Sequence, residues 1–160
     1  MNTKIWMSVV MFGALAAGVP VQAVTSRVGS AQDLGIGTEL GQPIGVTAKY
    51  WMNSTLAIDG AMGYHFNHNF DMHSDVLWHS FSSFDVSNGR LPFYLGAGGR
   101  VLLGNDSQLG LRLPVGVSYL SSNDPIEIFA EIAPVIELIK SIGLDVDGVV
   151  GIRLYINYIK

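Results

Sequence analysis

The sequence predicts an all-β fold, an eight-stranded antiparallel up-and-down transmembrane β-barrel with short connections on both sides. Three observations lead to this prediction. Apolar and polar residues alternate with period two in eight segments, the charged residues of those segments keep to one face, and no run of eighteen apolar residues follows the first segment of the chain. Only a closed barrel satisfies every backbone polar group in lipid without using helices.

The chain has 160 residues, which is enough for one domain preceded by an export signal. Residues 1–23 are expected to be a cleaved secretory signal, because Lys4 precedes a short apolar core at 5–17 and small residues follow at 21–23. The core is too short to span a bilayer. Residues 24–33 are polar and small and predict a flexible lead-in, and residues 34–160 form the expected barrel.

Composition excludes several classes of function. The chain has no cysteine, which rules out disulfides, thiol nucleophiles and thiolate metal ligands. Hydrophobic residues make up 49% of the chain and charged residues only 14%. Loss of Lys4 with the signal reduces the nine basic residues to eight, against 13 acidic residues, so the mature chain carries a net charge of −5. That charge argues against a nucleic-acid partner, whose phosphates require a basic surface.

The clearest alternation lies in the expected hairpin formed by segments 91–104 and 109–119. Leu95 and Val101 share an apolar face with Leu111, whereas the opposite face is mostly glycine with Arg100 and Arg112. Asn, Asp and Ser at 105–107 supply the turn. A soluble barrel would expose charges on its outer face, so this pattern favours lipid outside and a packed polar lumen inside.

The same alternation defines the other six strands, each bounded by turn residues. The expected ranges are 34–41, 44–52, 55–65, 70–81, 125–138 and 144–156. The connections at 41–43 and 53–54 are short, and 85–90 (DVSNGR) is the plainest turn of the chain. The inward face would hold nine acidic and four basic residues. Part of the excess carboxylate is therefore expected to be protonated, hydrated near the rims or balanced by cations.

Most of these inward residues are expected to form one network of ion pairs, because a barrel of eight strands is just wide enough for its own side chains. The predicted lumen network comprises Glu39, Lys49, Asp59, Arg100, Arg112, Glu127, Glu131, Glu137, Asp145, Asp147 and Arg153. Outward aromatic residues are expected at the two membrane interfaces. With both termini in the periplasm, the periplasmic group is Tyr50, Trp78, Phe93, Tyr119 and Tyr158, and the outer group is Tyr64, Phe66 and Phe70.

Three motifs carry a resemblance to a known class of proteins: GQPIGVTAKYW at 41–51, RLPFYLGAGGR at 90–100 and PIEIFAEIAPVIEL at 125–138. The chain resembles the small eight-stranded outer-membrane barrels of Gram-negative bacteria, of the OmpX and OmpA-domain type, and a subgroup of them without an implied activity. The resemblance implies contact with membrane lipid and assembly by the barrel-assembly machinery. Two features differ from the class: the outer loops are short, and the chain ends in Tyr158, Ile159 and Lys160 rather than in an aromatic residue.

One polar cluster is a weak candidate for a metal site. Imidazole and carboxylate groups recur on one strand face and across the neighbouring turn, at His65, Asp71, His73, Asp75 and His79. Such groups bind divalent metals when they converge. The alternative is that they belong to the lumen network, and we expect no bound metal and no cofactor.

Candidate catalytic groups are weaker still. The inward carboxylates of 127–147 suggest a paired-carboxylate hydrolase, but that chemistry requires a substrate cleft. Ser74 and Ser80 adjoin His73 and His79, yet neighbours in a strand point to opposite faces. GAGGR at 96–100 opens no helix and does not predict a phosphate loop.

We therefore expect a monomeric barrel without a catalytic site or a wide pore, with a structural or interaction role in the cell envelope. A narrow ion or water channel is the first alternative, and a lipid-modifying enzyme is the second. If the apolar face pointed inward, the chain would instead be a soluble, ligand-binding barrel of the lipocalin type.

Overall fold

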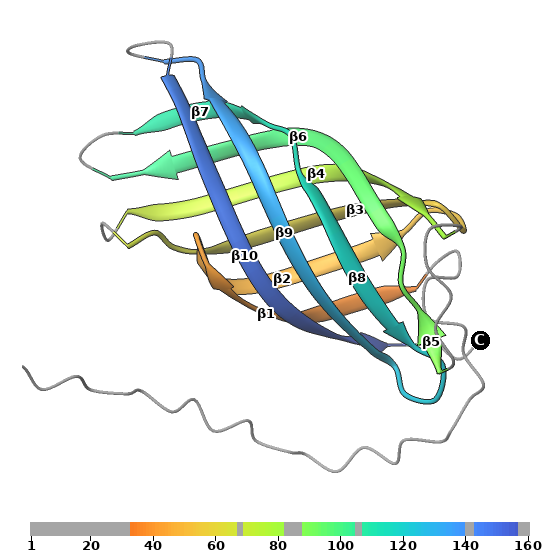
Figure 1. The fold of residues 1–160 in the computed structure, drawn as a ribbon. Coiled ribbons are helices and arrows are strands. Elements are labelled where there is room, and N and C mark those ends of the chain that lie inside the picture. Colours follow the sequence, from red (N-terminus) through yellow and green to blue (C-terminus); the bar gives the residue numbers. More distant parts are fainter. Residues whose placement is uncertain (1–32, 67–68, 82–87, 105–106, 140–142, 157–160) are drawn as a thin grey trace, which may run out of the picture.

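The computed structural model describes residues 33–66, 69–81, 88–104, 107–139 and 143–156 (Figure 1). Within these ranges the chain forms only β-strands. The strands are β1 (Leu34–Gly41), β2 (Ile44–Trp51), β3 (Leu56–Tyr64), β4 (Phe70–Ser80), β5 (Gly89–Arg90), β6 (Phe93–Leu103), β7 (Gln108–Arg112), β8 (Val115–Ser121), β9 (Ile126–Glu137) and β10 (Gly143–Ile156). No helix in the described ranges has the length and apolar character needed to cross a membrane. The expected signal at 1–23 and the lead-in before Asp33 lie outside the described residues.

All the described strand pairs are antiparallel and join into one closed sheet. Strands β1 to β4 pair in chain order, and β4 pairs with β6. Strand β6 pairs with β7 and β8, both of which pair with β9, and β5 extends the sheet by pairing with β8. Strand β9 pairs with β10, and the ring closes where β1 pairs with β10, with Leu34 opposite Ile156. Figure 1 shows β10 and β9 crossing the front of the barrel, with β1 to β4 behind them. Strand β1 begins and strand β10 ends at the same end of the barrel, which we call the terminal end. The opposite end, at Tyr64 and Phe70, is the distal end.

Two prolines interrupt the strand ladders without changing the eight-stranded ring, Pro114 inside a predicted strand and Pro92 at the start of one. β5 and β6 are separated at Leu91 and Pro92, and β7 and β8 at Leu113 and Pro114. Proline lacks the N–H that a ladder requires. The register nevertheless continues across both breaks, since Arg90 lies opposite Leu120, Leu95 opposite Val115 and Gly98 opposite Arg112. The predicted eight-stranded barrel is therefore confirmed for the described residues.

The predicted turn at 85–90 needs a correction. Gly89 and Arg90 are not part of the turn but form β5, which pairs with Ser121 and Leu120 of β8. The backbone hydrogen bonds of β8 extend the hairpin beyond Pro92, and the composition of the DVSNGR segment gave no sign of this pairing. Residues 85–87 lie outside the described residues.

Burial follows the predicted alternation in every long strand. In β4, for example, Asp71, His73 and Asp75 are buried, whereas Met72 and Val76 are exposed. The exposed set is mainly apolar on all sides of the barrel, and the buried set includes most of the charged residues of the strands. The usual arrangement of a soluble domain, with an apolar core and a polar surface, is thus inverted.

An apolar cluster fills the lumen at the terminal end. Trp51, Ala57, Leu120 and Tyr155 are buried together, and Phe81 packs against them. The indole of Trp51 donates a hydrogen bond of 2.9 Å to the hydroxyl of Tyr155. This cluster fills one end of the interior, and the N–H of the indole, its one polar group, has a hydrogen-bond partner.

Inward glycines make room for the largest lumen side chains. A Cβ atom at Gly116 would lie 2.5 Å from the Tyr94 ring, and one at Gly98 would lie 2.1 Å from the carboxylate of Asp75. Glycine at these two positions therefore allows bulky and charged groups on the opposite strand to fit inside a narrow barrel.

Candidate functional site

The charged lumen is the most distinctive chemical feature of the barrel. The side chains predicted to face inward do so, and those in its middle are almost completely buried, including Lys49, Arg100, Arg112 and Arg153. Because buried charges are costly unless they are paired, their partners determine what the lumen does.

One group of ion pairs lies next to the apolar cluster of the terminal end. The ammonium of Lys49 contacts Glu127 Oε1 at 2.7 Å, and the guanidinium of Arg153 contacts Glu127 Oε2 at 3.4 Å and Asp59 Oδ2 at 3.1 Å. The hydroxyl of Tyr155 donates to Glu127 at 2.6 Å. Glu127 therefore links two cations to the aromatic closure of the lumen.

A second group extends toward the distal end and is built around two arginines. Arg112 binds Asp75 and contacts Glu131 at 2.5 Å, and its Nε lies 3.5 Å from Asp147. Arg100 contacts Asp147 at 2.6 Å and Asp145 at 2.8 Å. Glu137 lies farther from Arg100, at 3.8 Å, and is partly exposed near the rim. The four lysine and arginine side chains of the lumen thus contact more carboxylates than there are cations. Several carboxylates therefore share one cation.

Two acidic residues of the lumen have no cationic partner from lysine or arginine in the described part of the chain. Glu39 is 1% exposed, and its Oε1 has no hydrogen-bond partner there. Asp71 is buried, with His65 Nδ1 at 3.6 Å and His73 Nδ1 at 4.0 Å, and neither of its oxygens accepts a hydrogen bond from a described residue. Glu39 therefore faces the lumen as the sequence predicts, but it forms no ion pair with a lysine or arginine of the network among the described residues.

The five residues of the candidate metal cluster are divided among different neighbours. Asp71 lies between His65 and His73, whereas Asp75 binds Arg112 and His79 Nε2 lies 2.8 Å from Lys49 Nζ. Same-face residues two apart in a strand are separated by about 6.6 Å, which is too far for one ion without a contribution from other strands. Within the described ranges, no group of three or more such residues is arranged to hold a metal ion.

The residues considered for catalysis are also placed apart. Ser74 faces outward and donates a hydrogen bond to the carbonyl of Asp59 at 3.0 Å, while His73 faces the lumen. The acidic residues of 127–147 contact arginine or lysine in the lumen. The segment 96–100 lies within strand β6 and does not begin a helix.

Several lumen residues were missed by the selection of charged groups alone. Thr47 Oγ1 accepts hydrogen bonds from Arg153, the hydroxyl of Tyr94 donates to Glu131 at 3.0 Å, and the ring of Phe129 lies 3.9 Å below the Arg153 guanidinium. The alternation of inward and outward positions in each strand places these three side chains inside, so it is the signal that could have found them. Neutral donors and rings thus supplement the few cations of the lumen.

The outward aromatic residues occupy the two ends of the barrel. Tyr50 and Trp78 are exposed toward the terminal end, with Phe93 and Tyr119 partly exposed there. Tyr64, Phe66 and Phe70 lie at the distal end, where the rings of Tyr64 and Phe70 meet edge to face with centroids 5.8 Å apart. Tyr158 lies outside the described residues.

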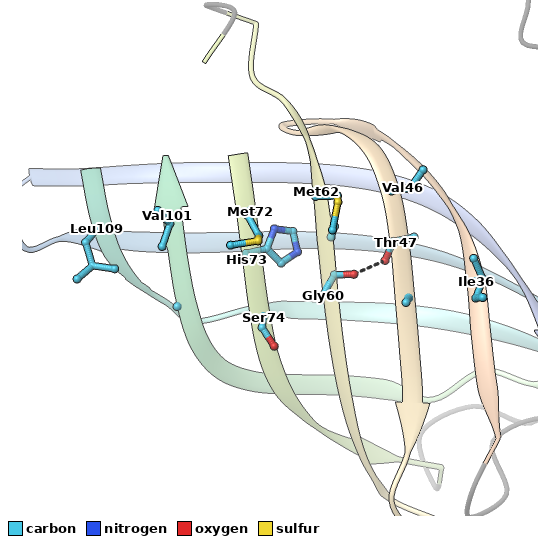
Figure 2. Close-up of a pocket in the computed structure, with 13 residues that line it drawn as sticks. Ile36, Val46, Thr47, Gly60, Met62, Met72, His73, Ser74, Val101 and Leu109 are labelled. Carbon is cyan, nitrogen blue, oxygen red and sulfur yellow. Dashed lines mark hydrogen bonds between the residues drawn. The ribbon is translucent and has the colours of Figure 1, made fainter. Parts of the chain in front are cut away.

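The outer wall carries a hollow of about 600 Å³ across strands β2, β3, β4 and β6 (Figure 2). Its floor is a row of small outward residues that lie opposite one another in register: Ala48, Gly60, Ser74 and Gly99. A parallel row of larger residues borders it on the distal side: Val46, Met62, Met72, Val101 and Leu109. We call this feature the outer trough.

Comparison with known proteins supports the architecture. No family model matches the chain, and no curated protein matches it. Its structure is similar to the crystal structure of the N-terminal β-barrel domain of OprF from Pseudomonas aeruginosa, with a TM-score of 0.59. The two chains share a fold. They are 13% identical, and the match covers 79% of this chain and 98% of that one.

Proposed function

We propose that this chain is a monomeric outer-membrane barrel that spans the bilayer, has a closed lumen and serves a structural or interaction role in the envelope, without catalysis. One observation carries the proposal: every Asp, Glu, Lys and Arg in the described strands lies on the inward face, while apolar side chains cover the outer wall. An arginine or lysine on the outer wall would cost about 2–4 kcal/mol in the middle of a bilayer.

The contacts of the inward side chains support the proposal of a closed lumen. The apolar cluster of Trp51 and Tyr155 fills the terminal end, and the ion pairs of Arg153, Arg112 and Arg100 follow one another toward the distal end. An ion crossing this interior would have to displace buried and mutually paired charges. The likeness to the OprF barrel domain adds support for the fold, and the export signal and assembly by the barrel-assembly machinery are part of the proposal.

The first experiment is expression of the full-length chain, followed by cell fractionation and electrophoresis with and without boiling. We expect a compact, heat-modifiable band in the outer membrane. A soluble periplasmic protein without the shift would overturn the proposal and favour the lipocalin-like alternative.

A second experiment separates the closed barrel from a narrow channel. Purified protein in planar bilayers is expected to show no stepwise conductance. Discrete openings would replace the structural role with a transport role.

A third experiment addresses the enzyme alternative. Altered lipid A or phospholipid in membranes that overproduce the protein would indicate an enzyme.

A further inference from the structure

We propose that the outer trough holds one acyl chain of a bilayer phospholipid, an inference that rests on the proposed membrane location. The hollow is lined by the floor row, by the larger side chains of the distal row and by Ile36, so it is more than a stripe of small side chains. Tyr50, Ile58, Val76 and Ala97 form the next outward row on the terminal side of the floor. Ile36 lies opposite Ala48 at one end, and Leu111 lies opposite Gly99 at the other.

The trough is long enough to hold a large part of one chain. Its floor crosses four neighbouring strands, and three interstrand spacings give a length of about 14 Å. One leaflet of the hydrocarbon core is about 15 Å deep, half of a typical thickness of ~30 Å. The floor runs across the strands, which are tilted by about 35–45° in such barrels, so the trough is inclined to the membrane plane and can follow a chain into the bilayer.

The chemistry of the trough selects hydrocarbon. The hydroxyl of Ser74 is the only side-chain polar group of the floor row, and it is already engaged with the carbonyl of Asp59. No outward residue of the described strands is charged, so the trough offers no partner for a sugar or phosphate headgroup. A site that contacts only the hydrocarbon chain, and no headgroup, favours an ordinary phospholipid over an anionic glycolipid.

The border of the trough is suited to a flexible apolar ligand. Met62 and Met72 lie directly opposite each other beside the floor, as Figure 2 shows, and they are 49% and 42% exposed. Methionine side chains are flexible and polarisable and adapt to varied apolar surfaces. Within the described residues, these two and Met52 are the only methionines, so two of the three border this one feature.

The test uses the mature chain refolded into phosphatidylcholine vesicles that contain a phosphatidylcholine with a photoreactive diazirine on one acyl chain. Mass spectrometry then maps the labelled residues. We expect several-fold more label on Met62 and Met72 than on Ile128 and Ile152, which are exposed on the outer face of β9 and β10 and line no hollow.

A filled-trough variant provides the matched comparison. Ala48→Leu combined with Gly99→Leu places two large side chains on the floor, and a Cβ at Gly99 meets no atom closer than 3.7 Å. This variant is expected to lose the enrichment, whereas Ala130→Leu, on the outer face of β9, should keep it. The heat-modifiable band verifies that each variant has folded.

The remaining outcomes are distinguishable. Equal labelling around the barrel would overturn the trough as a lipid site while leaving the barrel intact. Cross-linking of two copies through Met62 or Met72, without lipid label, would assign the trough to a second copy instead. Failure of the wild-type chain to enter vesicles or to give a heat-modifiable band would overturn the proposed membrane role and this inference together.

Discussion

Replacement of Arg112 by methionine is expected to be the most destabilising single substitution in the lumen. Arg112 is completely buried and contacts Asp75, Glu131 and Asp147. Without it, Glu131 still accepts a hydrogen bond from Tyr94, and Asp147 still contacts Arg100. Asp75 has no other cation within ion-pair distance among the described residues, and removal of one partner from a buried pair costs about 3–5 kcal/mol. We therefore expect Arg112→Met to lower the free energy of unfolding by about this amount.

The assay is urea unfolding of the refolded protein in vesicles, followed by tryptophan fluorescence and by heat-modifiable migration. The double variant Arg112→Met with Asp75→Asn removes the stranded charge and should recover part of the loss, because residues in one network do not act additively. Glu137→Gln is the control, since Glu137 is partly exposed near the rim and lies 3.8 Å from Arg100; it should cost less than about 1 kcal/mol. A loss for Arg112→Met as small as that of the control would refute the idea that this arginine neutralises the middle of the lumen.

Three other perturbations test separate parts of the structure. Glu39→Gln should raise the free energy of unfolding by about 1–3 kcal/mol, because it removes a buried carboxylate without an ion-pair partner; a lower urea midpoint would show that Glu39 has a stabilising partner. Ile132→Arg, in the middle of β9, should cost about 2–4 kcal/mol in vesicles, whereas Leu144→Arg, at the distal start of β10, should cost only about 0–1 kcal/mol; equal costs would contradict the assigned membrane depth. Addition of zinc to the refolded barrel should leave its melting temperature unchanged, and a clear increase would restore His65, Asp71 and His73 as metal ligands.

The strands and their orientation could be predicted from the sequence because a single rule controls both. In β4, alternation alone places Asp71, His73 and Asp75 inside and Met72 outside, as the structure shows. Six uninterrupted strands begin and end within one residue of the expected positions. The breaks at Pro92 and Pro114 are equally local in origin, since each follows from the missing N–H of proline.

The partners within the lumen could not be predicted, because they depend on how the ring of strands closes. Arg153 of β10 reaches Asp59 and Thr47, which precede it by about a hundred residues in the chain. The isolated position of Glu39 and the division of the histidine cluster result from the same long-range geometry. The outer trough is a further example: Ala48, Gly60, Ser74 and Gly99 share no local motif and come together only through the register of four strands.

The arrangement of the lumen also explains why closure and stability are linked in this barrel. A passage for ions would require Arg112 to leave three carboxylates and the Trp51 and Tyr155 side chains to leave the terminal end. Both groups share partners with the rest of the interior: Tyr155 binds Glu127, which holds Lys49 and Arg153, and Asp147 joins Arg112 to Arg100. Movement of one side chain would therefore leave several buried charges unpaired at once, so opening requires a concerted change of most of the interior. The same contacts that would keep the lumen closed under the proposed function also join strands across the interior of the barrel.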